Sequence, residues 1–267
     1  MTAPASLSAS ATTPRAARVG PLLLPWAGIA GFFLIWWLLT DVLHPEGFLA
    51  RFALSRSLLA LGHLVVEGEL WPHLAASLRR IVVGLAISVT LGLPLGLAVG
   101  TLPRFGTASA PLFHFLRMVS PLSWTPLAIM LFGVGDTPVY FLIAMAGMWP
   151  IVLSTSAAVA SFDRRLLLVG RSLGGSRLEV ARTIVWPSIR PQVATGIRLS
   201  IGLGWVVLVP AEMLGVDSGL GYFALSTRDR LDYSELAATI IVTGLLGVAI
   251  DRVARWSLSS SASSRRT

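Results

Sequence analysis

Long apolar windows without a charged residue are the feature that most restricts how this chain can fold. An α-helix needs about 20 predominantly apolar residues to cross a bilayer. Six uncharged windows stand out: 19–40, 81–103, 118–135, 137–162, 199–211 and 236–250. The last two are short and reach full length only with flanking residues. With 54% hydrophobic and 13% charged residues over 267 positions, the chain is predicted to be an all-α, polytopic membrane protein with six transmembrane helices.

Missing residue types exclude several kinds of chemistry. The chain has no cysteine, which rules out disulfides, thiol nucleophiles and cysteine-ligated metals. All 21 basic residues are arginine, so the lysine of a Walker A phosphate loop or of a Schiff base is absent. The four histidines show no spacing typical of metal ligands. We therefore predict a protein that is not an enzyme and has no cofactor, and any ATP hydrolysis belongs to another chain.

The distribution of arginine predicts the orientation in the membrane. Cytoplasmic flanks of transmembrane helices carry an excess of basic residues. Two arginines precede the first window, six lie between Arg164 and Arg190, and four follow the sixth window. Placing all three groups inside the cell requires an even number of crossings, so both termini are predicted to be cytoplasmic. Arg79 and Arg80, at the outer start of the second window, contradict this rule and need a local explanation.

The arginine-rich stretch at residues 163–191 is predicted to form two short cytoplasmic helices. Gly174 and Gly175 end the first helix in a left-handed turn. Ser176 is then the N-cap of the second helix, within an S-x-x-E capping box. Pro187 is expected to end that second helix before the chain returns to the membrane.

Small residues recur at every fourth position in two of the predicted membrane helices. This spacing lets helix backbones approach closely inside a membrane. The positions are Gly92, Gly96 and Gly100 in the second helix, and Gly196, Ser200 and Gly204 in the fifth. We predict that they serve ordinary packing within the bundle, and contact with a second subunit or with the solute pathway is the alternative.

Three stretches of the chain resemble the permease subunits of ATP-binding-cassette (ABC) importers. Their cytoplasmic motif reads Glu-Ala-Ala, three residues, Gly, nine residues, Ile, any residue, Leu-Pro. Here Gly174 matches the glycine, residues 184–187 read IVWP at the required spacing, and residues 168–170 read LVG in place of EAA. The stretches SPLSWTPLAIMLFGVGD and GIRLSIGLGWVVLVPAEMLGVDSGLGY resemble the branch that imports nitrate, aliphatic sulfonates and taurine. The resemblance covers residues 74–256.

This resemblance implies a type I ABC importer permease fold, also called MetI-like, in the bacterial inner membrane. It implies a homodimer of two permease copies, ABC ATPase subunits and a periplasmic or lipid-anchored substrate-binding protein as partners, within the lipid bilayer and without nucleic acid. The solute is then a small anion such as nitrate, an aliphatic sulfonate or taurine, and a pyrimidine or thiamine precursor or an aromatic acid is the alternative. A secondary transporter fits less well, because the central windows lack ion-coupling carboxylates.

In such permeases the cytoplasmic segment transmits motion of the ATPase to the membrane helices, which alternate between inward-facing and outward-facing states. The residues expected to carry this coupling are Arg171, Gly174, Gly175, Ser176, Arg177 and Pro187. The glycines provide the shape of the segment. The arginines either meet acidic groups on the ATPase or contact lipid headgroups.

The chain is accordingly expected to divide into five parts. The first 18 residues are mainly Ala, Ser, Thr and Pro, a composition typical of a disordered tail, here cytoplasmic. The other parts are a first transmembrane helix at 19–42, a periplasmic loop at 43–73, the permease core at 74–256 with the coupling segment at 163–191, and a polar cytoplasmic tail at 257–267.

Polar side chains inside membrane helices are costly and usually functional. Those singled out as pathway or intramembrane polar residues are Arg117, Ser120, Trp124, Trp205 and Glu212. Ser120, Trp124 and Trp205 could line the solute pathway, although tryptophan more often packs between helices or at the membrane interface.

The two charged members of that set are expected at opposite depths. Arg117 is expected near the cytoplasmic start of the third helix. Glu212 is expected near the outer surface, about 27 Å along the fifth helix from Ala194. Glu212 is therefore predicted to pair with Arg79 or Arg80. A pathway-lining or solvated Glu212 is the alternative.

Overall fold

A computed structural model describes residues 24–263 of the chain. Every regular element in that range is a helix, which agrees with the predicted all-α class. The chain forms two compact units, Met1–Ser55 and Arg56–Thr267. The N-terminal tail expected at 1–18 lies outside the described residues.

The first unit contains the helix that was expected at 19–42. Its elements are α1 (Leu24–Trp37), a π-helical turn η1 (Leu38–Leu43) and a 3-10 turn η2 (Leu49–Phe52). The carboxylate of Asp41 accepts a hydrogen bond of 2.9 Å from the backbone N–H of Leu54, at the start of the next helix. Most of the region expected as a periplasmic loop at 43–73 is helical, because it contains η2, a helix at Leu54–Val66 and the start of the helix Leu70–Thr101.

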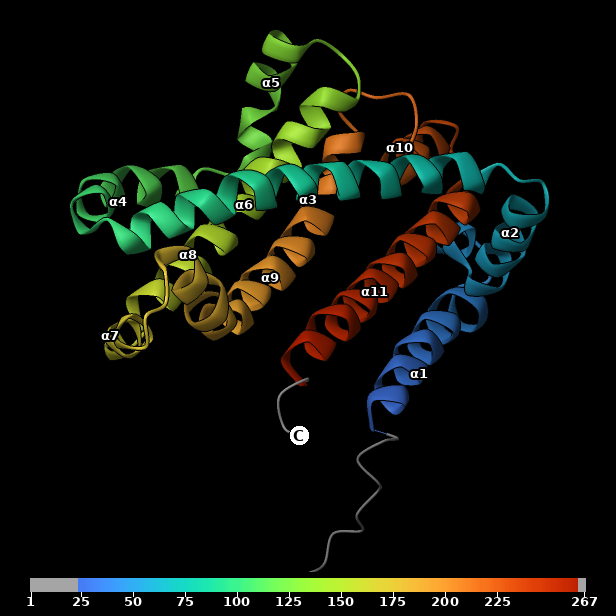
Figure 1. The fold of residues 1–267 in the computed structure, drawn as a ribbon. Helices are drawn as coiled ribbons and strands as arrows, with labels where there is room; N and C mark the ends of the chain where they lie inside the picture. Colours follow the sequence, from blue (N-terminus) through green and yellow to red (C-terminus); the bar gives the residue numbers. More distant parts are fainter. Residues whose placement is uncertain (1–23, 264–267) are drawn as a thin grey trace, which may run out of the picture. The chain divides into compact units, whose positions relative to one another are not determined.

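The second unit is a bundle of helices joined by short connections (Figure 1). Its helical elements are α2 (Leu54–Val66, which starts at the boundary between the units), α3 (Leu70–Thr101), α4 (Pro103–Met118), η3 (Pro121–Trp124), α5 (Thr125–Phe132), α6 (Asp136–Ala160), α7 (Arg165–Ser172), α8 (Arg177–Val180), η4 (Ala181–Val185), α9 (Trp186–Glu212), α10 (Leu220–Asp229) and α11 (Tyr233–Ser263). Helix α11 thus extends into the region expected as a polar tail, and α10 lies in the connection between α9 and α11.

Four helical stretches of the described chain are apolar and long enough to cross a membrane. They are Leu70–Thr101, Asp136–Ala160, Arg177–Glu212 and Tyr233–Ser257. A fifth candidate is the pair Pro103–Met118 and Pro121–Phe132, whose halves meet at 90°. The shorter apolar helix Ala27–Leu43 belongs to the first unit, so the predicted count of six crossings is compatible with the structure.

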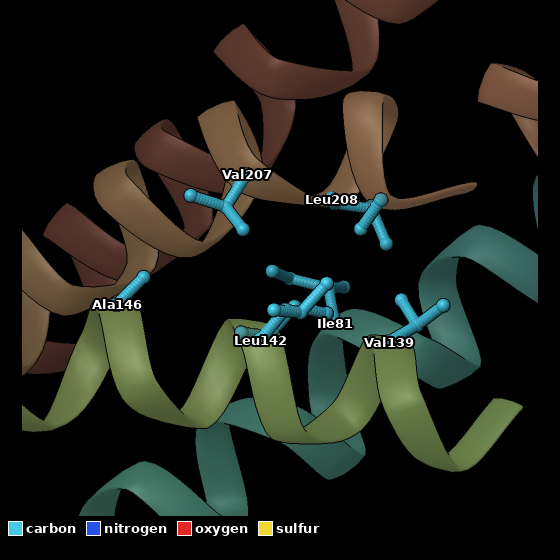
Figure 2. Packing of buried hydrophobic residues seen from close by; sticks show 8 residues of the cluster. Ile81, Val139, Leu142, Ala146, Val207 and Leu208 are labelled. Atoms are coloured by element: carbon cyan, nitrogen blue, oxygen red, sulfur yellow. The ribbon is translucent and has the colours of Figure 1, made fainter. Parts of the chain in front are cut away.

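Helix α6 forms the centre of the second unit, because it packs extensively against both α3 and α9, which also contact each other. Figure 2 shows the apolar cluster between these three helices, with side chains from α6 placed among those from α3 and α9. Val139, Leu142 and Ile143 of α6 are almost completely buried there, as are Ile81 of α3 and Leu208 of α9.

Small residues permit this close packing, as the four-residue spacing predicted. A Cβ atom added at Gly96 of α3 would lie 2.7 Å from the Cβ of Thr155 and 2.9 Å from the backbone oxygen of Val152. On α9, a Cβ atom at Gly196 would lie 2.9 Å from the backbone oxygen of Pro150. Backbone atoms cannot move aside as a flexible side chain can, so α3 and α9 both need small residues where they cross α6. The prediction of packing within the bundle is confirmed.

Gly96→Ala is expected to lower the free energy of unfolding by about 1–3 kcal/mol, the usual cost of over-packing a dense core. Gly202→Ala is the matched control, because a Cβ atom at this position of α9 has no neighbour within 4 Å. Its stability should stay level or rise by up to about 1 kcal/mol, since alanine favours a helix over glycine. Thermal unfolding of both variants in detergent measures the difference, and equal melting temperatures would contradict the packing argument.

One expected membrane helix is interrupted. Window 118–135 was expected to form a single helix, but α4 ends at Met118, and Val119 and Ser120 adopt extended ψ angles of 126° and 131°. Pro121 explains the break, because proline disfavours the helical conformation in the residue before it. Arg117 consequently lies in the last turn of α4, about 21 Å from its start at Pro103. The expectation that Arg117 is close to the cytoplasmic start of its helix is wrong.

Candidate functional site

The segment at 163–191 begins with a helix that ends in a glycine turn. Helix α7 is followed by Gly174 with a φ angle of +83°. The N–H of Gly175 donates to the carbonyl of Gly170 at 3.1 Å, and the N–H of Gly174 donates to the carbonyl of Arg171 at 3.0 Å. These two bonds form a Schellman motif, which satisfies carbonyls at the helix end. The predicted left-handed turn is confirmed at Gly174.

A second reason for small residues in this segment is the close approach of α7 to the following helices. A Cβ atom at Gly170 would lie 2.7 Å from Cδ1 of Ile184, and one at Gly175 would lie 2.8 Å from the carbonyl oxygen of Gly170. Gly170 stands where the importer motif has alanine, so the departure in spelling keeps the small size that the packing requires. The sequence interpretation did not single out this residue, although the alanine of the motif was the signal for it.

Ser176 begins the second short helix, as predicted. Its hydroxyl accepts a hydrogen bond of 3.2 Å from the backbone N–H of Glu179. This bond satisfies one of the free N–H groups at the start of α8.

Ser176→Ala is expected to destabilise α8 by about 1 kcal/mol, the typical effect of losing an N-cap. Amide hydrogen exchange at residues 177–180 should then speed up by about fivefold, since local opening follows this free energy. Ser172→Ala is the control, because that hydroxyl accepts no capping bond and donates to the carbonyl of Val169. Equal exchange in the two variants would show that the cap has no energetic role.

Pro187 does not end the second helix, and that expectation is wrong. Residues Arg177–Glu212 form one helical stretch, in which the π-helical turn η4 precedes Trp186 and Pro187. Proline is tolerated in the first turn of a helical segment, where its missing N–H is not needed. The hydroxyl of Ser188 donates to the carbonyl of Ile184 at 2.7 Å, which satisfies one acceptor beside the proline.

The surface of this segment combines apolar and basic side chains. Leu168, Leu173 and Leu178 are exposed, Leu173 by 82%. Arg171 and Arg177 are also exposed, and within residues 24–263 neither forms an ion pair. The segment therefore offers free positive charge and apolar surface together.

A cluster of charged side chains joins α3, α6 and α9 at the other end of the second unit. Asp136 begins α6, while the far end of α6 leads into α7, so the cluster and the segment at 163–191 lie about 37 Å apart along this helix. Nη1 of Arg80 lies 2.9 Å from Oε1 of Glu212, and Nη2 lies 2.7 Å from Oδ1 of Asp136. The side chains of Arg80 and Glu212 are 1% and 0% exposed. The predicted pairing of Glu212 is confirmed, and its partner is Arg80.

Arg79 has a different environment although it is the next residue. It pairs with the other carboxylate oxygen of Asp136, and its side chain is 60% exposed. Both arginines that contradict the charge rule are thus neutralised by acids at the same end of the unit. Asp136 was not singled out from the sequence, although its position at the edge of an uncharged window was a signal.

The connection between α9 and α10 closes over this cluster. Arg80 donates to the carbonyl of Ser218 at 2.6 Å and to its hydroxyl at 2.9 Å. Glu212 accepts from the hydroxyl of Ser77 at 2.8 Å and from the backbone N–H of Gly221 at 2.9 Å. Every charge in the cluster is therefore compensated by specific partners, which burial of ions requires.

Gly219 makes that closure sterically possible. Its φ angle is +106°, and an added Cβ atom would lie 2.4 Å from Cδ of Glu212 and 2.5 Å from Nη1 of Arg80. Its N–H donates to Nδ1 of His73 at 3.1 Å. Both conformation and space therefore require glycine at this position, which the sequence interpretation missed.

A cavity of about 450 Å³ lies between α4, α6 and α9. Arg117 borders it from α4, Trp149 and Leu153 from α6, and Leu199 and Leu203 from α9. A smaller cavity of about 180 Å³ on the α3 side of α4 shares Arg117, Trp149 and Leu153 with it. Arg117 thus borders both cavities.

The other polar residues singled out from the sequence are not brought together with Arg117. Ser120 lies in the break after α4, although it is not among the residues that line the cavity. Trp124 packs against the core cluster, and its Nε1 has no hydrogen-bond partner within the described part of the chain. Trp205 packs against α11, where a Cβ atom at Gly247 would lie 2.6 Å from its Nε1.

Comparison with known proteins gives the family. Residues 88–260 match the binding-protein-dependent transport system inner membrane component family. The chain is 31% identical over 249 residues to the bicarbonate transport system permease protein CmpB of Synechococcus elongatus, covering 90% of this chain and 89% of that protein. It is 35% identical over 185 residues to the taurine transport system permease protein TauC of Escherichia coli, covering 69% and 66% of the two chains. The nitrate import permease protein NrtB of Leptolyngbya laminosa is 32% identical over 185 residues, again covering 69% and 66%.

The fold also matches a solved structure. A chain of the MetNI methionine ABC transporter, in inward-facing conformations, superposes with a TM-score of 0.61 over 73% of this chain and 98% of that chain, at 13% identity. This likeness supports the MetI-like fold that the sequence predicted. The chain belongs to the binding-protein-dependent transport system inner membrane component family, and it is a multi-pass permease subunit of an ABC importer.

Proposed function

We propose that this permease imports a small solute with a compact anionic group, such as bicarbonate, nitrate or a sulfonate like taurine. The observation that carries the proposal is the set of relatives, because permeases named for bicarbonate, taurine and nitrate match two thirds or more of this chain. The three solutes differ in shape, but each bears a compact, delocalised negative charge. The proposed solute class therefore rests on the negatively charged group that bicarbonate, nitrate and taurine have in common.

The segment at 163–191 is proposed as the contact with a separate ATPase subunit. Its exposed leucines and unpaired Arg171 and Arg177 form a surface that suits an apolar groove with acidic edges. The Schellman turn at Gly174 and the cap at Ser176 make the segment rigid. Because η4 continues directly into α9, motion of the segment can pass along this helix into the membrane.

A second copy of the chain is proposed to complete the solute pathway. Leu199, Leu203 and Val206 of α9 border the cavity and are exposed in a single chain. A homodimer would cover this apolar surface and enclose the cavity between the two copies.

The positive-inside distribution of arginine supports cytoplasmic termini, and a periplasmic or lipid-anchored binding protein would then deliver solute at the end that carries the Arg80 cluster.

Reconstitution tests the proposed function. The permease, its ATPase and its binding protein are placed in proteoliposomes, with ATP on the side of the ATPase and labelled bicarbonate, nitrate or taurine on the other. We expect ATP-dependent accumulation of at least one of these anions that needs the binding protein. Accumulation of none of them, by a complex that hydrolyses ATP, would contradict the proposed solute class.

A further inference from the structure

Arg117 lies about halfway through the membrane-spanning part of the second unit. Trp149, which borders the same cavity, is about 20 Å along α6 from Asp136 and about 17 Å from Ala160. Leu199, on the opposite wall, is about 20 Å from each end of α9. The cavity is therefore near the middle of a bilayer whose hydrocarbon core is about 30 Å thick.

A cation at this depth is costly unless it faces water, an anion or a buried partner. Arg117 has no carboxylate within ion-pair distance among residues 24–263. Its Nη2 lies 3.3 Å from Nδ1 of His114. An imidazole carries no negative charge in any of its protonation states near neutral pH, so this contact does not neutralise the guanidinium. The charge of Arg117 is therefore not balanced by any acid in the described part of the chain.

Lipid headgroups do not account for this charge. The centre of the hydrocarbon core is about 15 Å from either headgroup region, farther than an arginine side chain extends. The cavity is bordered by residues of α4, α6 and α9. Its other walls are mostly apolar, including Trp149, Leu153 and Leu203, and they leave the guanidinium as the one charged group on the lining.

We infer that Arg117 contacts the anionic group of the solute as it crosses the middle of the membrane. This inference rests on the proposed function and assigns the charge-recognising residue within it. The planar guanidinium can donate two parallel hydrogen bonds to a carboxylate-like, nitrate-like or sulfonate group. The rest of the lining is mostly apolar, with Ser154 as a further polar side chain, so the solute is recognised mainly by its charge.

The absence of cysteine from the chain permits a direct test with Arg117→Cys. The variant is reconstituted with the ATPase and the binding protein, and uptake of an anion that the unaltered complex transports is measured. Loss of the charge should reduce uptake about tenfold or more, because a charge-assisted contact is removed. A trimethylammonium-ethyl thiosulfonate reagent should return uptake to within about threefold of the unaltered complex, since it restores a fixed positive charge near this position. A sulfonatoethyl thiosulfonate reagent, which adds a negative charge, should not restore it.

Arg104→Cys is the matched control. Arg104 lies in the first turn of the same helix, is exposed and does not border the cavity. Its uptake should be unchanged before and after either reagent, and so should that of the unaltered, cysteine-free chain. Arg117→Lys provides a second variant that needs no reagent. It keeps the charge but loses the bidentate geometry, so it should retain more uptake than Arg117→Gln, which should match the unmodified cysteine variant.

The outcomes separate this inference from the proposed function. If the unaltered complex accumulates no anion, the proposed function fails. If it accumulates an anion and Arg117→Cys or Arg117→Gln transports it equally well, the inference about Arg117 is overturned while the proposed function remains. The inference is also overturned if both reagents have the same effect, or if Arg117→Lys loses as much uptake as Arg117→Gln. Copurification of the ATPase with each variant shows that the compared complexes are assembled.

Discussion

Replacing Arg80 with methionine is expected to lower the free energy of unfolding by about 3–5 kcal/mol, whereas Arg79→Met should lower it by about 1 kcal/mol or less. The two arginines are adjacent in the sequence and pair with the same carboxylate, that of Asp136. They differ in burial, because the side chain of Arg80 is 1% exposed and that of Arg79 is 60% exposed. This pair of variants therefore contrasts a buried arginine that has several partners with an exposed arginine that pairs with Asp136.

The large effect at position 80 comes from the partner that is left behind. Glu212 is fully buried and would lose its positive neighbour, while the carbonyl of Ser218 would lose a donor. An uncompensated buried charge carries a high free-energy cost, whereas an exposed ion pair is screened by solvent. Arg79→Met removes only a partner that solvent can replace.

Thermal and denaturant unfolding of the purified permease in detergent measures both variants. The double variant Arg80→Met with Glu212→Gln is the informative combination. The neutral amide at position 212 removes the unpaired buried charge, so the double variant should recover part of the stability that Arg80→Met loses. Exchanging the two charges is a poorer test, since a carboxylate at position 80 would face Asp136 and an arginine at position 212 would face the N–H of Gly221. Equal losses at positions 79 and 80 would show that burial does not determine the strength of this network.

Gly174→Val is expected to abolish solute uptake while membrane insertion and the amount of protein remain near normal. Gly174 has a φ angle of +83°, a conformation that is strongly unfavourable for a β-branched residue. A Cβ atom at this position has no neighbour within 4 Å, so the effect comes from backbone strain of about 1–3 kcal/mol. Relieving that strain would move α8 relative to α7 and alter the surface proposed to meet the ATPase.

Gly174→Asn is the matched control, because asparagine adopts the left-handed conformation more readily than other residues with a side chain. Its uptake should remain within about threefold of the unaltered complex. ATP-driven uptake in proteoliposomes, together with copurification of the ATPase, compares the two variants. Normal uptake with valine at position 174 would contradict a coupling role for this turn.

Much of the fold could be predicted from the sequence because the relevant interactions are local or periodic. Uncharged windows of membrane length, glycines at every fourth position and the glycine turn before Ser176 each depend on neighbouring residues along one helix. The same reasoning reduced the partner of Glu212 to two adjacent arginines. It could not choose between them, because neighbouring residues on a helix point in different directions, and only the packing of α3 on α6 and α9 buries Arg80 rather than Arg79.

The predictions at Pro121 and Pro187 were wrong, because the effect of a proline on a helix depends on the residues that surround it. Pro121 breaks the third apolar window, whereas Pro187 lies inside a continuous helical stretch that a π-helical turn accommodates. Both residues lack an N–H and restrict the preceding residue. Whether the helix breaks or continues depends on the hydrogen bonds that neighbouring side chains and turns supply. A local sequence pattern does not contain that information.

The sequence by itself determined that this chain is an all-helical membrane protein with a basic, glycine-braced segment, because apolar length, charge sign and backbone freedom are properties of residues in order. Only the tertiary structure decided which residues share an environment. It brought Ser77, Asp136, Ser218 and Gly219 around one buried ion pair, and it placed Arg117 in the last turn of α4 beside a cavity. These groupings join positions up to about 140 residues apart, and their energies come from burial and compensation of charge among packed helices.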